Sequence, residues 1–251
     1  MKCKLTVKDI FDYTNSVAPF ENQCEWDNSG LVVGSFDAEA KKIGVVLDIT
    51  SDAVKYAAEN GIDLIISHHP VIFRPVKTFL ADDIPFMLAK SGISAICAHT
   101  SLDIAKGGVN DALAEALGFE NATPLAESGE ESMVRVVETA GTTADELAKL
   151  VAEKLSTCVT VADGGKPIRK IALCGGAGAD FFEKSGCDAY ITGEVKHHEY
   201  LQAKECGITL IAAGHFETEN PVVTVIADKI KDNFDCDVEI IPQNSPVKYY
   251  K

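Results

Sequence analysis

All six histidines of the chain lie close behind short apolar runs, where β-strands are expected to end. They are His68, His69, His99, His197, His198 and His215. Acidic residues follow two of them at the same spacing, Asp103 after His99 and Glu219 after His215. Ligands of open α/β sheets bind beyond the carboxyl ends of the strands. Imidazoles and carboxylates gathered there suit zinc, iron, manganese, cobalt or nickel, and so many donors favour two divalent metal ions that share a bridging carboxylate.

The adjacent histidines His68 and His69 follow one apolar run, 62–67. Side chains alternate along a strand, so the two imidazoles cannot leave an intact strand in the same direction. At a fraying strand end they can splay and bind one ion each, and Pro70 restricts His69 to extended geometry. We therefore interpret the pair as a fork that serves two metals.

Each of these residues also has an interpretation without a metal. His99 could be a hydrogen-bonded core residue, Asp103 a turn residue and Glu219 a helix cap. The histidines at 197–198 lie in a helix-like segment, 194–205, where simple exposure is the preferred interpretation. The conjunction of histidines at strand ends favours the metal site.

Strand-like and helix-like segments alternate along most of the chain. The expected strands are 41–50, 62–69, 93–99, 169–180, 186–194 and 207–215, and the expected helices are 51–61, 84–92, 109–118, 142–155 and 224–234. Ser51 or Asp52 is the expected cap of the helix 51–61, and Thr142 or Thr143 that of the helix 142–155. The rhythm predicts an α/β fold, with helices packed on the faces of mixed sheets.

The second half of the chain echoes the first. Segment 61–67 resembles segment 186–192, and both precede histidines. Strands opening at 92–93 and 207–208 end in His-x3-Asp and His-x3-Glu. We therefore predict an N-terminal α/β lobe at 1–125 and a C-terminal lobe at 126–251 that is a pseudo-repeat of the first. Chance similarity between short α/β units is the alternative.

Composition indicates an ordinary globular protein of the cytoplasm. The N-terminus lacks the pattern of a secretory signal, and no apolar run reaches membrane-spanning length. The eight cysteines form no CxxC pair, and Cys97 and Cys174 are expected in the core. A formal charge of −15 makes nucleic acid an unfavourable partner.

Two further segments invite interpretation. Residues 24–34 contain the sole tryptophan, Trp26, beside Asp27 and Asn28, and are expected to form a core anchor followed by a turn. The glycine-rich run 174–178 could bind phosphate through backbone N–H groups, but a tight turn is preferred because the P-loop residues are missing.

Several motifs now form a recognisable series. In order, they are Trp26-Asp27-Asn28-Ser29-Gly30-Leu31, Ser67-His68-His69-Pro70, His99-Thr100-Ser101-Leu102-Asp103, Gly175-Gly176-Ala177-Gly178, Thr192-Gly193-Glu194 and Gly214-His215-Phe216-Glu217-Thr218-Glu219. Over nearly the whole chain the series resembles the GTP cyclohydrolase I type 2 homolog family, also called the Nif-three-like family.

The resemblance implies two related α/β lobes that enclose a dinuclear metal cleft, assembled into a ring-shaped homohexamer. The metal ligands that it implies are His68, His69, Asp103, His215 and Glu219, with Glu219 as the bridge. It places His99 in the same cleft as a proton-handling or supporting residue.

The resulting expectation is a metal-dependent hydrolase that acts on a nucleotide or another phosphate-bearing small molecule through metal-activated water. For a cyclohydrolase, the attack would fall on C8 of guanine, with His99 or Glu194 moving protons as catalytic residues. Two divalent ions bring more charge than two carboxylates remove, so the pocket would attract an anionic substrate. The alternatives are a non-catalytic metal-binding regulatory or metal-delivery protein that forms a ring-shaped oligomer, and a ring-shaped scaffold for proteins or DNA.

Overall fold

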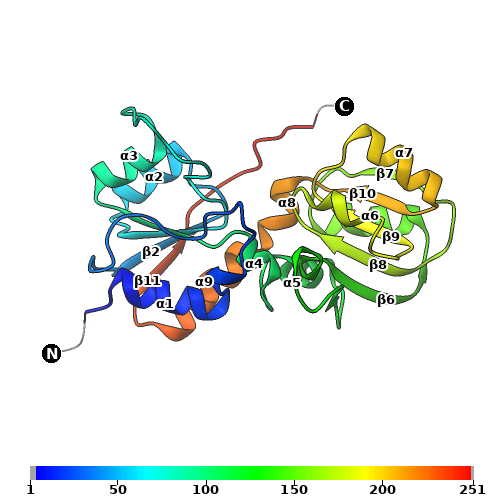
Figure 1. The fold of residues 1–251 in the computed structure, drawn as a ribbon, viewed down its shortest axis with the longest axis horizontal. Coiled ribbons are helices and arrows are strands. Elements are labelled where there is room, and N and C mark those ends of the chain that lie inside the picture. Colours follow the sequence, from blue (N-terminus) through cyan, green and yellow to red (C-terminus); the bar gives the residue numbers. More distant parts are fainter. Residues whose placement is uncertain (1–3, 250–251) are drawn as a thin grey trace. The chain divides into compact units, whose positions relative to one another are not determined.

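The computed structural model describes residues 4–249, so residues 1–3, which entered the argument against a secretory signal, lie outside the described residues. The chain divides into two compact units, each built around its own sheet (Figure 1). The first comprises the described residues to Lys106 together with Val223–Asn244, and the second comprises Gly107–Val222 with the described residues from Ser245 onward. Both sheets are mixed and flanked by helices, which confirms the predicted α/β class.

The first unit contains a five-stranded sheet with the order β1-β4-β3-β2-β11. Its strands are β1 (Gly30–Val33), β2 (Lys42–Val46), β3 (Leu64–Ser67), β4 (Ser94–Cys97) and β11 (Asp237–Ile240). β1 runs antiparallel to β4, whereas β4, β3, β2 and β11 are parallel. The carboxyl ends of β3 and β4 therefore meet at one edge, which is where the sequence places His68, His69 and His99.

Helices cover both faces of this first sheet. They are α1 (Val7–Val17), α2 (Ser51–Glu59), α3 (Ile84–Ser91), α4 (Thr100–Ile104), α9 (Pro221–Asn233) and the 3₁₀ turn η1 (Phe20–Asn22). α2 and α3 pack together on one face, and α1 lies beside α9 on the other (Figure 1). The core under α2 and α3 takes alternate residues of the strands, including Val46, Ile65 and Ala95, as strand geometry requires.

The second unit contains a six-stranded sheet with the order β5-β6-β8-β9-β10-β7. Its strands are β5 (Thr123–Pro124), β6 (Arg135–Thr142), β7 (Thr160–Ala162), β8 (Ile168–Cys174), β9 (Ala189–Thr192) and β10 (Thr209–Ala212). β8, β9 and β10 are parallel, and β6 and β7 flank them in antiparallel directions. The carboxyl end of β10 leads directly to His215.

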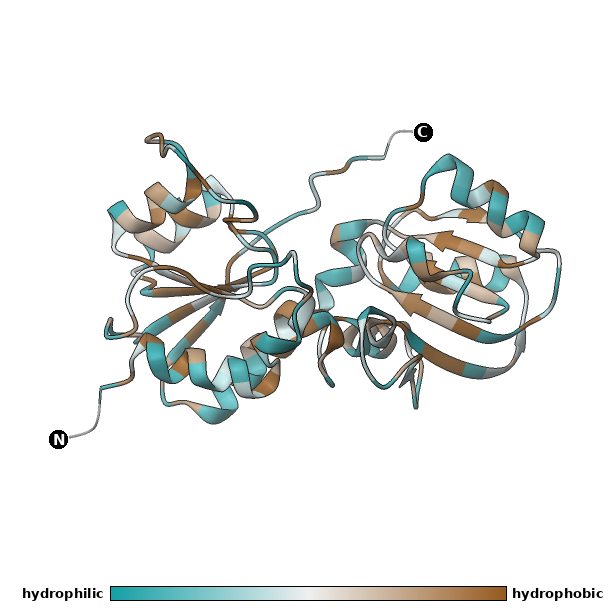
Figure 2. Cartoon of the chain, viewed as in Figure 1, coloured by the Kyte–Doolittle hydropathy of each residue, from teal (hydrophilic) through white to brown (hydrophobic). Residues whose placement is uncertain are grey.

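The helices of the second unit are short. They are α5 (Val109–Leu117), α6 (Ala144–Lys154), α7 (His197–Cys206), α8 (His215–Glu219) and the 3₁₀ turns η2 (Glu130–Met133) and η3 (Gly178–Phe181). Apolar side chains of α5 and α6 share one core with β6, β8, β9 and β10, while α7 packs against β7 and β10. The strands of both units are hydrophobic along most of their length (Figure 2), and this matches the burial of β3, β4, β9 and β10 at every position.

The division by packing differs from the predicted lobes 1–125 and 126–251. α5 packs into the core of the second unit, so that unit already begins at Gly107. After α8 the chain returns to the first unit, because β11 pairs in parallel with β2 from Asp237 to Ile240. The first unit therefore consists of two separate stretches of sequence.

Helix caps follow the expected chemistry with one correction. Thr143 and Glu146 form a capping box at the start of α6, as predicted. At α2 the expected cap, Ser51 or Asp52, is wrong by one or two residues, because the side chain of Thr50 accepts the Ala53 N–H at 3.2 Å. Within residues 4–249, no helix is both long and apolar enough to cross a membrane.

Candidate metal centre

The carboxyl end of β3 carries two imidazoles that differ in burial. His68 is completely buried, and its Nδ1 donates to the carbonyl oxygen of Ala98 at 2.9 Å. His69 is 23% exposed, and its Nδ1 lies 2.7 Å from Oδ1 of Asp48. The two ring centroids are 4.8 Å apart and the planes are tilted by 46°. The pair is thus splayed at the strand end and anchored to different partners.

The third imidazole of the first unit belongs to His99, which precedes α4 at the end of β4. Its Nδ1 lies 2.8 Å from Oδ1 of Asp27, a carboxylate with no exposed side-chain area. Its backbone N–H donates to the Ser29 hydroxyl at 3.0 Å. The ring centroid lies 5.1 Å from that of His68 and 5.5 Å from that of His69. The loop before β1 therefore fixes both the backbone and the ring of His99.

These hydrogen bonds determine which nitrogen each ring offers to a cation. A carbonyl or a carboxylate only accepts, so Nδ1 carries the proton in His68, His69 and His99, and a neutral ring keeps its lone pair on Nε2. One ring nitrogen of each of the three residues lies within 4.8 Å of the others. Histidines that bind metals almost always donate their other N–H to a carboxylate or a carbonyl in this way. The donor set fits a divalent transition metal.

A carboxylate on α4 adjoins this cluster. Oδ1 of Asp103 lies 3.8 Å from Nε2 of His68, and the Asp103 side chain is 13% exposed. α4 begins after His99, and the N–H of Asp103 donates to the His99 carbonyl at 3.1 Å. The short helix thus keeps Asp103 on the side of the cluster that His68 faces.

Asp27 is held as an anion although it is buried. Burial on its own would raise the pKa of Asp27, but hydrogen bonds from His99 and Thr100 outweigh it and hold this pKa well below the usual range. The carboxylate accepts from the Thr100 N–H at 2.9 Å. An ionised Asp27 keeps His99 in the Nδ1–H tautomer, so Nε2 of His99 can accept a proton or bind a cation.

The neighbouring cysteine is not suited to replace these ligands. Cys97 is completely buried in β4, as predicted, and its Sγ donates to the His68 carbonyl at 3.0 Å. The pKa of this thiol is raised well above its ordinary value, mainly by burial and to a smaller extent by the negative charges of Asp27 and Asp103. The cysteines among the described residues form no disulfide, and Cys174 is buried in the core as predicted.

In the second unit, His215 and Glu219 stand one turn apart on α8. Nε2 of His215 lies 3.0 Å from Oε2 of Glu219, and Nδ1 of the same ring lies 3.0 Å from Oε1 of Glu194. The side chain of Glu219 is only 7% exposed, whereas that of Glu194 is 61% exposed. Glu219 is the last residue of α8, and α9 begins shortly after it at Pro221.

The glycine-rich run after β8 makes room for this pair of donors. At Gly176, whose φ is +59°, an added Cβ would lie 2.1 Å from Oε1 of Glu219 and 3.1 Å from Nε2 of His215. At Gly193 an added Cβ would lie 2.8 Å from the His215 Cα. Side chains at either position would collide with α8. The run therefore allows α8 to approach the sheet closely.

The same run does not form a phosphate cradle at its first two amides. The Gly175 N–H donates to Oδ1 of Asn110 at 2.8 Å, and the Gly176 N–H donates to the Thr218 hydroxyl at 3.1 Å. The preferred interpretation of a tight turn is correct. Its amides serve the packing of α5 and α8 instead of an anion.

The parallel strands of the two sheets pair in equivalent registers, but the histidines of the two units do not occupy equivalent positions. Asp63 and Asp188 start equivalent strands, and each accepts two backbone N–H groups, of residues 41–42 and of residues 169–170, at 2.9–3.0 Å. Counted from these two aspartates, His68 is equivalent to Gly193 and His69 to Glu194. The strand register likewise makes His99 equivalent to Gly214. The expected equivalence of His99 and His215 is therefore wrong by one position.

The remaining histidines belong to neither donor set. His197 and His198 start α7 and are exposed, which agrees with the interpretation that they are surface residues. Sequence reasoning missed two carboxylates that orient imidazoles, Asp48 and Asp27. Asp27 had a usable signal, because it lies in a polar turn next to the sole tryptophan. Trp26 itself is 54% exposed, so its expected role as a core anchor is wrong.

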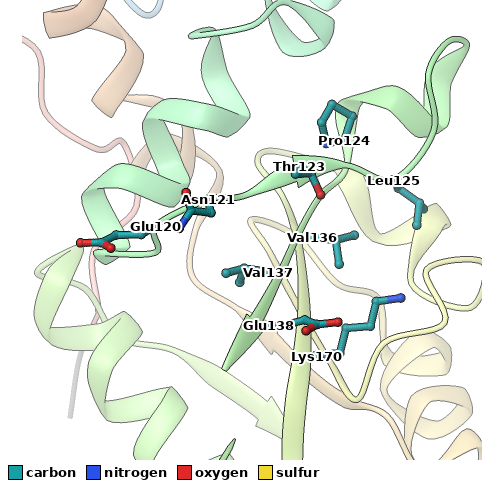
Figure 3. Close-up of a pocket in the computed structure, with 9 residues that line it drawn as sticks. All are labelled: Glu120, Asn121, Thr123, Pro124, Leu125, Val136, Val137, Glu138 and Lys170. Carbon is teal, nitrogen blue, oxygen red and sulfur yellow. The ribbon is translucent and has the colours of Figure 1, made fainter. Parts of the chain in front are cut away.

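A hollow in the second unit is separate from these residues. It has a volume of about 580 Å³ and lies over β5 and β6 (Figure 3). Its lining residues are Glu120, Asn121, Thr123, Pro124, Leu125, Val136, Val137, Glu138 and Lys170. The hollow contains none of the predicted site residues, and its side chains include both signs of charge.

The comparisons with known proteins agree over nearly the full chain. Residues 5–246 match the family model described as Duf34/NIF3 (NGG1p interacting factor 3). A Clostridium perfringens protein named GTP cyclohydrolase 1 type 2 homolog is 36% identical over 250 residues, which cover 94% of this chain and 95% of that protein. A Helicobacter pylori protein named GTP cyclohydrolase 1 type 2 is 34% identical over a match that covers 88% of this chain and 90% of that protein. A Staphylococcus aureus hypothetical protein of known structure matches with a TM-score of 0.90 at 25% identity, covering 98% of this chain and 100% of its own.

Proposed function

Because the chain belongs to the Duf34/NIF3 family, as its sequence motifs indicated, we propose that it is a metal-dependent hydrolase acting in the cytoplasm on a nucleotide or a similar phosphate-bearing molecule. The proposed ligands of two divalent ions are His68, His69, Asp103, His215 and Glu219. The observation that carries the proposal is the cluster of three imidazoles in the first unit, each anchored through Nδ1. Relatives named GTP cyclohydrolase 1 type 2 give the reaction class its precedent.

The proposed ions would supply Lewis acidity and lower the pKa of bound water, as divalent metals do in hydrolases. Their charge would also attract an anionic substrate into the pocket of a protein with a net charge of −15.

The protein residues have their own part in the proposed chemistry. His99 accepts a proton at Nε2, and the buried Asp27 carboxylate stabilises the imidazolium that results. Glu194, which is mostly exposed, accepts a hydrogen bond from Nδ1 of His215 and can exchange protons with solvent. We assign proton transfer to His99 and Glu194. The anchoring of His68 and His69 keeps their Nε2 lone pairs available for the ions.

We also propose that the chain assembles into a ring-shaped homohexamer, as the family resemblance implies. Nucleic acid remains an unfavourable partner because the chain is strongly acidic.

The experiment starts from metal analysis of the purified protein by inductively coupled plasma mass spectrometry. Activity is then screened on nucleotides and phosphodiesters before and after chelation and metal return. We expect His69→Ala and Glu219→Gln to lose metal and turnover, because a lost ligand lowers metal affinity by at least about tenfold. His198→Ala is the matched control, since it removes an exposed imidazole from α7.

The possible results separate the candidate functions. Turnover that requires metal and disappears in both ligand variants supports the hydrolase. Stoichiometric metal without turnover on any substrate class contradicts it and favours the regulatory or metal-delivery alternative. Absence of metal, with no uptake on reconstitution, contradicts both.

A further inference from the structure

The sole tryptophan is exposed next to the imidazole cluster of the first unit. Trp26 is 54% exposed, although tryptophan is highly buried on average. The ring of Phe73 lies beside it, with centroids 5.5 Å apart, and Phe73 is 47% exposed. Two large apolar rings that remain open to solvent at one place indicate a surface that contacts another molecule.

Both rings also adjoin His99. The Trp26 centroid lies 5.9 Å and the Phe73 centroid 6.2 Å from that of the His99 ring, and both meet the imidazole edge to face, at 72° and 73°. The planes of Trp26 and Phe73 are tilted by 47° to each other. The rings thus form an angled apolar surface that borders the cluster of His68, His69 and His99.

The loops that carry these rings are fixed to each other. Nδ2 of Asn28 donates to the Ile72 carbonyl at 2.7 Å, so the residues next to Phe73 are tied to the loop of Trp26. On the other side of Asn28, the buried Asp27 carboxylate accepts from Thr100 and His99. Hydrogen bonds therefore hold Trp26 and Phe73 in position before any ligand arrives, which lowers the entropic cost of binding.

We propose that Trp26 and Phe73 form a stacking platform that binds a planar aromatic ring of the substrate beside the imidazole cluster. The inference rests on the proposed hydrolase function. It narrows the substrate class, from a nucleotide or a similar phosphate-bearing molecule, to molecules that carry an aromatic heterocycle. Aromatic faces bind planar rings of many kinds by offset stacking. The platform selects the ring, and the adjoining site acts on it.

The sole tryptophan makes this platform directly observable, because all indole fluorescence comes from Trp26. Metal-loaded protein is titrated with guanosine monophosphate and with ribose 5-phosphate, which share the sugar and the phosphate but differ in the ring. We expect the nucleotide to quench the fluorescence and to bind at least about fivefold more tightly than the sugar phosphate. Calorimetry on the same samples measures both affinities independently.

Two variants test the aromatic faces. Phe73→Leu keeps an apolar side chain but removes the ring, and we expect it to weaken nucleotide binding by at least about fivefold while leaving ribose 5-phosphate binding and metal content unchanged. Trp26→Leu, followed by calorimetry, should have the same effect. Phe79→Leu is the matched control, because Phe79 belongs to the same loop region and is 49% exposed.

The failure of this inference is distinguishable from failure of the proposed function. Metal-loaded protein that binds both ligands equally, that binds neither, or that retains full nucleotide affinity in Phe73→Leu overturns the platform alone. Protein that takes up no metal overturns the hydrolase. If Phe73→Leu instead lowers the molar mass in solution and spares nucleotide binding, the rings pack against another copy and the platform is refuted.

Discussion

Replacing Gly176 with alanine tests whether the absence of a side chain at this position is what lets His215 and Glu219 of α8 lie against the glycine-rich run. Gly176 has φ +59°, and an added Cβ would lie 2.1 Å from Oε1 of Glu219. The atom that it meets is the end of a flexible side chain, so the carboxylate can rotate away and the protein should still fold. Such a rotation removes Glu219 from its place beside His215, 3.0 Å away.

The backbone strain of an alanine at positive φ can be separated from the collision of its Cβ with Glu219. A left-handed residue other than glycine costs roughly 1–2 kcal/mol, and each kcal/mol lowers the melting temperature of a chain of this size by about 2–4 °C. Gly165→Ala is the matched control, because Gly165 has φ +71° and no atom lies within 4 Å of an added Cβ. Both variants should therefore melt about 2–8 °C below the wild type.

Metal affinity should distinguish the two variants. We expect Gly176→Ala to bind metal at least about tenfold more weakly than the wild type, since a displaced carboxylate is a lost ligand. Gly165→Ala should bind as the wild type does. Competition with a chromogenic chelator measures the affinities, and circular dichroism checks the fold. Equal metal affinity in Gly176→Ala, Gly165→Ala and the wild type would refute the reasoning.

Two further predictions follow from the fold and the proposed assembly. Hydrogen bonds from the backbone N–H groups of Arg169 and Lys170 lower the pKa of Asp188 in the folded protein. The ionised carboxylate therefore stabilises the fold above the pKa of an aspartate in the unfolded chain, about 4. This stabilisation is lost as the pH falls through the lower pKa of the folded protein. Asp188→Asn should therefore melt below the wild type at neutral pH, with a difference that shrinks below about pH 4; a constant difference in a pH series of melting curves would contradict this. Light scattering should give a molar mass near six times the 26.8 kDa of one chain, and the mass of a single chain would contradict the ring.

The sequence predicts the strand ends well because burial leaves a clear pattern. β3, β4 and β10 are buried at every position, so their apolar runs are visible and the residues after them can be placed. β11 was missed, because its pattern of exposed and half-buried residues resembles a loop. Without β11 the return of the chain to the first unit could not be inferred, and the internal echo predicted two lobes that are each continuous in sequence.

The supporting residues of the candidate site were harder to predict. Asp27 and His99 are separated by 72 positions, and Asp48 and His69 by 21. Both carboxylates lie in loops, where no hydrophobic period reports which side chains come together. α4, which carries Asp103, has five residues and is too short to show a helical period. The residue types indicated a metal site, whereas the hydrogen bonds that orient the ligands depend on the folded loops.

The repeated register explains how one framework provides two different donor sets. Asp63 and Asp188 accept backbone N–H groups at the starts of equivalent strands. Beyond the strand ends, the Ala98 N–H donates to the Ser67 carbonyl at 3.0 Å, and the Ala213 N–H donates to the Thr192 carbonyl at 2.9 Å. The residues immediately after these pairs differ: the first unit has imidazoles where the second has glycines. Those glycines admit α8, and α8 presents a carboxylate and an imidazole in their place. The same backbone pairing with different residues at the strand ends is therefore sufficient to give three imidazoles in one unit and a single imidazole with a carboxylate in the other.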